Sequence, residues 1–568
     1  MIGKSTDCDW TIQTVHSWLQ SCRPDHDMCS HVSAMVNDWH PTRLVDLGPN
    51  RNSIYWTLYS TQEDGSLRMP VIYMALSYRW GANKLRLLNS TLAEFRKGTI
   101  SIHQLPQTFQ DFSFLAKRFG VRYLWIDALC IIQDSARDWE IESLRMRQVY
   151  ANSVCTIAAS ASTNEQEGLF RVRTNLDGVL PGLIQIPVTP LSSQDQRQMV
   201  PFYIFDDEVW ESSIYQSPLH RRGWAFQEQY LSPRMLYFTG NQVFWECIQG
   251  GRRCEGFPNG ISPYAGILRQ NGRVWNLKQQ LQRLQDNGGF TDMSTRVWCD
   301  LVTVYSRCDL TNPEDRLPAF AGLAKFFAEK VGDDYVAGHW KSRLLRDLCW
   351  TRDDIEAVTK PQASHMRRIA SWSWASIIDV PVYYAYPWDL SEDYPYDYLT
   401  NIVQVQVKPQ ANDDVFGPLS GDFLALHGVP LEKSVTFSEG VVCKDGICGV
   451  PMTTSSERSV NSQLPSPLAW CLDNPLEPDS EIALEKQTYL LPLKTSLCCG
   501  GGFYIQSLVL TPTVDSCAFP NTRCFTRVGL VTEHMWKGSD LAGFCPRQDG
   551  VMIFDESTRA RMELITIV

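Results

Sequence analysis

The sequence predicts an α/β fold in which a parallel sheet is flanked by helices, followed by a helical segment and a β-rich C-terminal region. Apolar runs of strand length lie at 71–76 and 121–126, and apolar residues recur at helical spacing between them, at 106–119. A strand, a helix and a strand in this order form a βαβ unit with parallel strands. Beyond residue 400, short alternating stretches are typical of strands.

The helix at 106–119 carries a signal at each end, because Pro106 suits a first helical turn and Gly120 suits the position after the last turn. Two early strands, at 42–47 and 54–59, are expected to form a hairpin. The remaining expected elements of this region are helices at 138–150 and from Ser217-Pro218 onward, and strands at 154–159, 235–238 and 243–247.

The length of 568 residues exceeds what one hydrophobic core usually organises, and the pattern divides into four parts. These are an N-terminal helical segment (1–40), an α/β domain (41–250), a helical extension packed on that domain (251–380) and a β-rich region (381–568). In the extension, Trp372 and Trp374 alternate with serines as in a strand, and we expect both to be core residues.

The charge balance, the N-terminal sequence and the cysteine content indicate which partners and which compartment to expect. Lys and Arg number 52 against 63 Asp and Glu, and the net charge of −11 argues against nucleic acid as a partner. The N-terminus lacks the apolar core of a secretory signal, and no apolar run reaches membrane-spanning length. We therefore expect a cytoplasmic protein without a membrane partner, whose 18 cysteines are mostly reduced.

Polar residues cluster where the two buried strands of the βαβ unit end. Tyr78, Arg79 and Trp80 follow the first strand, and Asp127 follows the second. Open α/β sheets bind ligands at the carboxyl edge, so these residues are candidate ligand contacts, with Arg79 suited to a phosphate or carboxylate. The alternatives are that Arg79 is a surface residue stacked on Trp80 and that Asp127 caps a helix or orders a turn.

Trp224 and Glu228 are four residues apart on the next expected helix and therefore share a face. A carboxylate beside an indole is a candidate catalytic acid or anion. The alternative is an exposed glutamate paired with Arg221 or Arg222.

Cys22, His26 and Cys29 have the spacing C-x3-H-x2-C, with Cys8 and His31 nearby, and four such groups could hold a tetrahedral zinc ion. The spacing is irregular and no second paired knuckle follows. We therefore expect ordinary packing and no bound metal, and a zinc-dependent binding protein is kept as an alternative.

Five ordered blocks resemble the heterokaryon-incompatibility (HET) domain of filamentous fungi, over roughly residues 40–250. The blocks are ALSYRWG at 75–81, LPQTFQD at 105–111, RYLWIDALCIIQD at 122–134, the pattern W-x-x-E-x-x-x-M-x-x-x-Y at 139–150 and RGWAFQEQYLSPRMLYF at 222–238. The resemblance implies a role in allorecognition and programmed cell death.

HET domains are distantly similar to Toll/interleukin-1 receptor (TIR) domains, which implies a TIR- or flavodoxin-like sheet. ALSYRWG resembles the first-strand signature of TIR domains, and Glu228 matches their catalytic glutamate. Ala225 stands where that motif has cysteine, and Glu142 is a competing candidate.

Enzymatically active TIR domains cleave NAD at the nicotinamide–ribose bond, so the resemblance implies NAD or a related nucleotide as substrate and no cofactor. It implies that Arg79 holds the pyrophosphate, that Tyr78 or Trp80 stacks on a ring, and that Trp224 lies among the substrate contacts. Asp127 would contact a ribose hydroxyl or order the loop. The alternative is a non-catalytic signalling module that acts through self-association and a protein partner.

Overall fold

The chain forms two compact units, Met1–Arg269 with Val274–Arg283, and Gln270–Arg273 with Leu284–Val568. The finer division into four parts remains a prediction. The computed structural model describes residues 3–26, 28–29, 39–61, 64, 71–82, 85–173, 182–188, 198–204, 209–249, 251–260, 277–286, 288–352, 369–377, 381–384, 396–409, 414–417, 419–433, 435–438, 441–444, 447–451, 468–472, 488–497, 503–513, 522–535, 544–546, 552–554 and 556–568. Within these ranges, no helix has both the length and the apolar character needed to cross a membrane.

The first unit is built on a mixed sheet, in which the described residues contribute nine strands in the order β11-β10-β9-β6-β3-β5-β1-β2-β4. The strands are β1 (Arg43–Asp46), β2 (Tyr55–Ser60), β3 (Tyr73–Ser77), β4 (Ile100–Ser101), β5 (Tyr123–Trp125), β6 (Thr156–Ala158), β9 (Arg234–Phe238), β10 (Val243–Cys247) and β11 (Gly251–Cys254). The expected hairpin is confirmed, because β1 and β2 pair antiparallel from Arg43 opposite Ser60 to Asp46 opposite Thr57.

The prediction of a parallel sheet holds only for its centre. Strands β5, β3, β6 and β9 are mutually parallel, whereas β1 joins β5, and β10 joins β9, in antiparallel register. The four central strands are parallel and need crossover connections, whereas short loops join β1 to β2, β9 to β10 and β10 to β11, and these pairs run antiparallel. Strand β1 pairs with β5 although the two strands are far apart in the chain. Strand β3 is buried along its whole length, which explains its unbroken apolar sequence.

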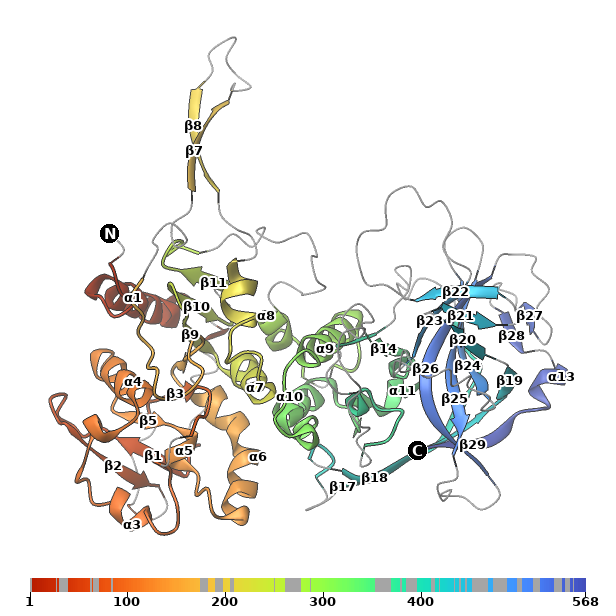
Figure 1. Ribbon diagram of the computed structural model, residues 1–568, viewed down its shortest axis with the longest axis horizontal. Helices are drawn as coiled ribbons and strands as arrows, with labels where there is room; N and C mark the ends of the chain where they lie inside the picture. The colour runs from red at the N-terminus through yellow and green to blue at the C-terminus, as the bar shows by residue number, and fades with distance from the viewer. Residues whose placement is uncertain are drawn as a thin grey trace. The chain divides into compact units, whose positions relative to one another are not determined.

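Helices cover the two faces of this sheet (Figure 1). They are α1 (Asp9–Asp25), α3 (Leu92–Phe95), α4 (Gln107–Arg118), α5 (Asp127–Cys130), α6 (Ala136–Asn152), α7 (Gly223–Leu231) and α8 (Leu277–Gln282), with a 3-10 turn at Ile102–Gln104. Helix α4 ends as the sequence predicts, with Gly120 at φ +76°, a conformation that glycine adopts without strain. Pro106 is the residue before the first turn.

The prediction that a helix starts at Ser217-Pro218 is wrong, because α7 begins at Gly223. A π-helical turn, Glu211–Tyr215, and a further turn precede it. Arg222 takes an extended conformation at φ −81° and ψ 132°, which interrupts the helix and lets its guanidinium reach the carbonyl oxygen of Tyr78 at 2.8 Å.

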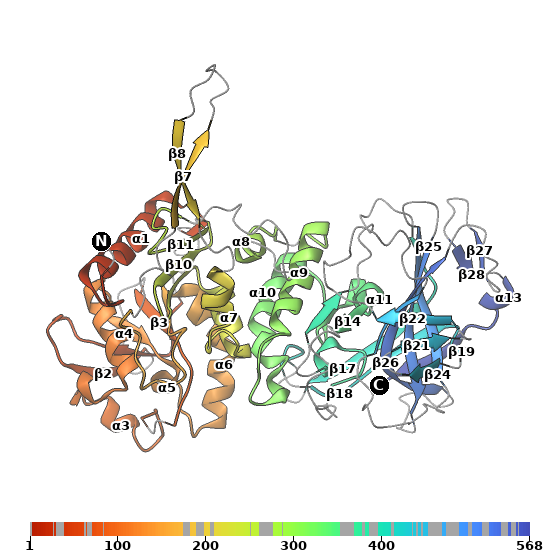
Figure 2. The same cartoon turned by 45° about the horizontal axis from the view of Figure 1, so that its top comes forward.

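A two-stranded ribbon, β7 (Gly182–Val188) and β8 (Gln198–Ile204), lies between β6 and α7 in the chain. Its strands pair antiparallel from Gly182 opposite Ile204 to Val188 opposite Gln198. The ribbon projects away from the helices and sheet of the first unit in both views (Figures 1 and 2).

The second unit has a helical part and a β-rich part. The helical part contains α9 (Asp292–Tyr305), α10 (Ala321–Val331) and α11 (Leu344–Asp347), with 3-10 turns at Pro313–Asp315, Pro318–Phe320, Lys341–Arg343 and Trp374–Ser376 and short strands β12 (Tyr335–Val336), β13 (His339–Trp340), β14 (Trp350–Arg352) and β15 (Val382–Tyr384). Trp372 and Trp374 are fully buried here, as expected. Their expected strand is wrong, because Trp374–Ser376 is a 3-10 turn whose start is capped by the Ser373 side chain.

The β-rich part confirms the prediction for the C-terminal region. Its described residues form a twelve-stranded sheet from β16 (Tyr396–Tyr398), β17 (Asn401–Pro409), β18 (Leu419–Gly428), β19 (Leu431–Lys433), β20 (Val435–Ser438), β21 (Val441–Lys444), β22 (Ile447–Pro451), β23 (Leu468–Leu472), β24 (Thr488–Leu497), β25 (Phe503–Pro512), β26 (Arg523–Met535) and β29 (Glu563–Ile567). Beside it lie the pair β27 (Phe544–Pro546) and β28 (Met552–Phe554) and the helix α13 (Glu556–Arg559).

Buried Arg527 of β26 joins the two parts of this unit. It donates hydrogen bonds to the carbonyl oxygens of Leu348 at 2.6 Å and Trp350 at 2.7 Å, and its guanidinium lies 3.5 Å from the centroid of the Trp350 ring.

Candidate functional site

The candidate site lies in the first unit, where β3 and β5 end side by side. These strands are parallel neighbours, so the residues that follow Ser77 and Trp125 reach the same edge of the sheet. Helix α7 brings Glu228 to this edge. The hydroxyl group of Ser77, the last residue of β3, lies close to the Glu228 carboxyl group.

Asp127 joins the two strand ends. Its Oδ2 accepts a 2.6 Å hydrogen bond from the indole Nε1 of Trp80, and its Oδ1 accepts one of 2.7 Å from the backbone N–H of Ala128. The ring of Tyr78 stacks on that of Trp80 at a centroid distance of 6.5 Å. Desolvation raises the pKa of Asp127, although the hydrogen bond from Trp80 favours its ionised form.

Glu228 is 8% exposed, and the alternative of an exposed, ion-paired glutamate does not describe it. Burial raises its pKa to about 8, and the nearby Asp127 carboxyl group acts in the same direction. Within the described part of the chain, neither its buried Oε2 nor the buried Ser77 hydroxyl forms a hydrogen bond of good geometry, although the hydroxyl groups of Ser77 and Tyr150 lie close enough to favour the ionised carboxylate. Buried polar groups are usually satisfied, so this pair marks a place where a ligand could supply the missing contact.

Arg222 is the cation whose charge acts on both carboxyl groups. From the sequence, Arg222 was considered only as a surface partner of an exposed Glu228. The positive charge of Arg222 favours the ionised forms of Asp127 and Glu228. Arg79 is exposed and has no ion-pair partner among the described residues. The signal that could have identified Arg222 is its position directly before Gly223, where the helix begins.

Trp224 and Glu142 contact residues outside the candidate site. Half-buried Trp224 packs edge-to-face against Trp139 of α6 at a centroid distance of 6.4 Å. Glu142 is buried on α6, and its Oε1 accepts a 2.6 Å hydrogen bond from the hydroxyl of Thr42. Oε1 of Glu142 therefore already accepts a hydrogen bond of good geometry, whereas Oε2 of Glu228 does not.

A shallow hollow opens beside Tyr78 and Trp80. It measures about 260 Å³ including open solvent, and it is lined by Tyr78, Trp80, Gly81, Leu85, Arg86, Phe109, Ala128 and Glu165. Pockets for drug-sized ligands usually measure ~300–1,000 Å³. A dinucleotide would therefore need the residues around Trp80 to move.

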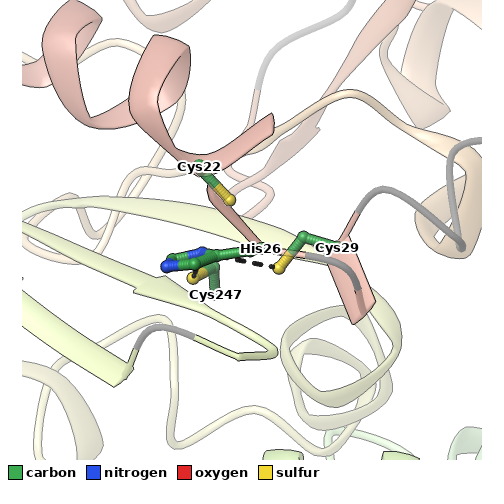
Figure 3. Close-up of side chains that lie close together, drawn as sticks. All are labelled: Cys22, His26, Cys29 and Cys247. Atoms are coloured by element: carbon green, nitrogen blue, oxygen red, sulfur yellow. Dashed lines mark hydrogen bonds between the residues drawn. The ribbon is translucent and has the colours of Figure 1, made fainter. Parts of the chain in front are cut away.

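The structure also brings Cys22, His26 and Cys29 together, and it adds Cys247 from β10, which sequence spacing did not reveal (Figure 3). Cys8 contacts Thr11 at 3.2 Å and is not in this cluster. His31 lies outside the described residues.

The fold and the site define the first unit as an open α/β domain with a buried carboxyl group at the carboxyl edge of its parallel strands. Residues 73–228 match the family model of the heterokaryon incompatibility protein (HET), and the chain therefore contains a HET domain over these residues. The match runs from the first residue of β3 to Glu228, so it contains Tyr78, Asp127 and Arg222. No curated protein and no solved structure matched the chain.

Proposed function

We propose that this HET-domain protein mediates allorecognition and programmed cell death, and that its first unit hydrolyses NAD in the manner of TIR domains. The observation that supports this best is Glu228, a buried carboxyl group at the carboxyl edge of the sheet whose Oε2 has no hydrogen bond of good geometry among the described residues. The parallel strands also support it, because their order β5-β3-β6-β9 corresponds to the start of the flavodoxin-like order 2-1-3-4-5.

The chemistry suits a single carboxylate. Nicotinamide leaves with the electron pair of its bond to the ribose, which turns the positively charged ring into a neutral molecule. Positive charge then builds on the ribose as an oxocarbenium-like centre, and a fixed anion in a dry site stabilises it. Water adds to the ribose carbon and loses a proton, and the products are nicotinamide, ADP-ribose and H⁺.

The raised pKa of Glu228 is compatible with this role. Near neutral pH much of the free protein carries the carboxyl group in its protonated form, because burial disfavours the charge. The ring of NAD is itself cationic, so its arrival would favour the ionised carboxylate. In this proposal Arg79 holds the pyrophosphate, Tyr78 and Trp80 contact a ring, Trp224 borders the substrate, and Asp127 contacts a ribose hydroxyl.

The test is the release of nicotinamide from NAD by the purified full chain at increasing protein concentration. We expect release by the wild type and none above background by Glu228→Gln. Glu142→Gln is the matched control, since Glu142 is a buried glutamate whose hydrogen bond lies elsewhere, and it should retain activity. Release that survives Glu228→Gln, or release that Glu142→Gln also abolishes, would count against Glu228 as the catalytic group.

A second function is a non-catalytic module that signals by self-association and by binding a protein partner. The observation that favours it is the small volume of the hollow beside Tyr78 and Trp80, which Glu228 does not line. A wild-type protein that self-associates yet releases no nicotinamide at any concentration would select this function.

A further inference from the structure

We propose that Cys22, His26, Cys29 and Cys247 bind one zinc ion, which fastens the end of α1 to β10. This proposal concerns a second site in the first unit and does not depend on the proposed NAD chemistry. It also replaces the expectation from the sequence that these residues only pack.

The four donor atoms already have the spacing of a tetrahedral site. They all lie within 4.8 Å of one another, and His26 Nδ1 is 3.4 Å from the sulfur of Cys247 and 4.0 Å from that of Cys29. Bonds of about 2.3 Å to sulfur and about 2.0 Å to nitrogen at tetrahedral angles place such atoms roughly 3.6 to 3.8 Å apart. Figure 3 shows the side chains converging from separate segments.

The chain supplies these donors from one local segment and one distant strand. Cys22 lies in the last turns of α1, His26 is the residue after that helix, and Cys29 follows shortly. Although the order C-x3-H-x2-C is irregular, its intervals are short enough for one segment to direct all three side chains at one ion. Cys247, the last residue of β10, completes the set because α1 packs against β10.

Buried Arg234 forms hydrogen bonds to two residues of the cluster, Cys22 and Cys29. It is 0% exposed, its Nε donates to the sulfur of Cys22 at 3.2 Å, and its Nη2 donates to the carbonyl oxygen of Cys29 at 3.0 Å. Three thiolates and a divalent ion carry a net charge of −1, which the guanidinium would offset. Hydrogen bonds of this kind orient metal ligands and stabilise thiolates in structural zinc sites.

Simple packing explains these contacts less well. Free cysteines are often buried as small apolar groups, and Cys22, Cys29 and Cys247 are at most 3% exposed. Apolar packing does not account for an imidazole among three sulfurs or for an arginine directed at one of them. In a reducing compartment, such a donor set favours zinc over a disulfide.

The ion would join segments on both sides of the family match. Cys22, His26 and Cys29 precede residue 73, and Cys247 follows residue 228. The matched segment would therefore be enclosed by a cross-link between the N-terminal helix and an outer strand of the sheet, and the flanks would be part of the folded unit.

The first experiment measures metal in the full chain, purified from zinc-supplemented cells without chelators. We expect about one zinc per chain. Exchange for cobalt should give the thiolate-to-metal charge-transfer absorption and the strong d–d bands of a tetrahedral sulfur-rich site. Wild-type protein that holds neither ion, or that carries a disulfide among these three cysteines, would overturn the proposal.

Variants then assign the ligands. His26 is only partly buried, so His26→Ala should fold and lose most of the bound zinc, whereas His26→Cys supplies a fourth thiolate and should retain it. Cys247→Ser should also lose zinc. Cys254→Ser is the matched control, because Cys254 is equally buried on neighbouring β11 and lies outside the cluster. Zinc content in His26→Ala equal to that of the wild type would contradict the assignment.

Discussion

The indole Nε1 of Trp80 donates a 2.6 Å hydrogen bond to Oδ2 of Asp127, and this bond joins the ends of β3 and β5 across the mouth of the candidate site. Trp80 is nevertheless 37% exposed, so its ring is available to a ligand.

The exposed ring of Trp80 leads to a prediction about substrate affinity. Stacking on a base contributes about 1–3 kcal/mol, so Trp80→Ala should raise KM for NAD by about tenfold or more with little change in kcat. Trp80→Phe keeps a ring and should retain most of the affinity. Steady-state kinetics of nicotinamide release would check this, and equal KM values for the two variants would exclude a stacking role.

The pKa of Glu228 predicts how activity depends on pH. The carboxyl group must be ionised to stabilise positive charge, and its pKa in the free protein is about 8. Below that pH, kcat/KM should fall about tenfold for each pH unit, and above it the rate should level off. A profile that is flat between pH 6 and 9 (roughly the range over which such a group titrates) would show that another group limits the reaction.

The same carboxyl group should lower the stability of the fold at alkaline pH. Its pKa is raised from 4.5 to about 8, so between these values the folded state holds a proton that the unfolded state has released. Stability therefore falls as pH rises through this window, by up to on the order of 4 kcal/mol. Glu228→Gln removes the titration, so its melting temperature should exceed that of the wild type at pH ~8.5 and converge with it near pH ~5. Parallel curves for the two proteins would contradict the buried, titrating carboxyl group.

Arg222 and Arg79 should affect activity in different ways. The charge of Arg222 favours the ionised form of Glu228, so Arg222→Gln should move the midpoint of the pH profile to higher pH. Arg79 is exposed, so Arg79→Gln should leave that midpoint unchanged and raise KM if it holds the pyrophosphate. A shift of the midpoint by Arg79→Gln alone would reverse the assignment.

Two arginines of β26 provide a matched test in the second unit. Arg527→Ala removes the donors to the carbonyl oxygens of Leu348 and Trp350 and the contact with the Trp350 ring, and should cost roughly 3 to 5 kcal/mol. Arg523 forms an ion pair with Glu563 in which both side chains are more than 40% exposed, and its guanidinium lies over the rings of Tyr489 and Phe525 at 4.4 and 5.1 Å. Because Arg523 itself is exposed, Arg523→Ala should cost less, roughly 1 to 2 kcal/mol. Urea unfolding of the full chain, followed by tryptophan fluorescence, would compare them, and similar midpoints would contradict the role of Arg527.

Local patterns predicted the central elements well. The apolar run at β3, the helical spacing of α4 and the hairpin of β1 and β2 are encoded within short windows, where periodicity reports burial directly. The antiparallel pairing of β1 with β5 was not predictable, because these strands are far apart in the chain. The start of α7 was misplaced because Ser217-Pro218 is a strong local signal, whereas Arg222 adopts its extended conformation through a tertiary contact with Tyr78.

The same distinction applies to the sites. Glu228 could be named as a candidate from the sequence because its motif lies within one helix. The charge of Arg222 acts on Glu228 in three dimensions, and Cys247 joins Cys22 and Cys29 only because α1 packs against β10. Spacing along the chain carries no information about such partners.

The ribbon of β7 and β8 has a practical consequence for protein engineering. Its first and last residues, Gly182 and Ile204, stand opposite each other, so the points where the chain enters and leaves the ribbon are adjacent. The ribbon could thus be excised and the ends rejoined by a short glycine-rich turn, or its strands extended to carry a reporter, without re-routing the sheet or helix α7, which carries Glu228.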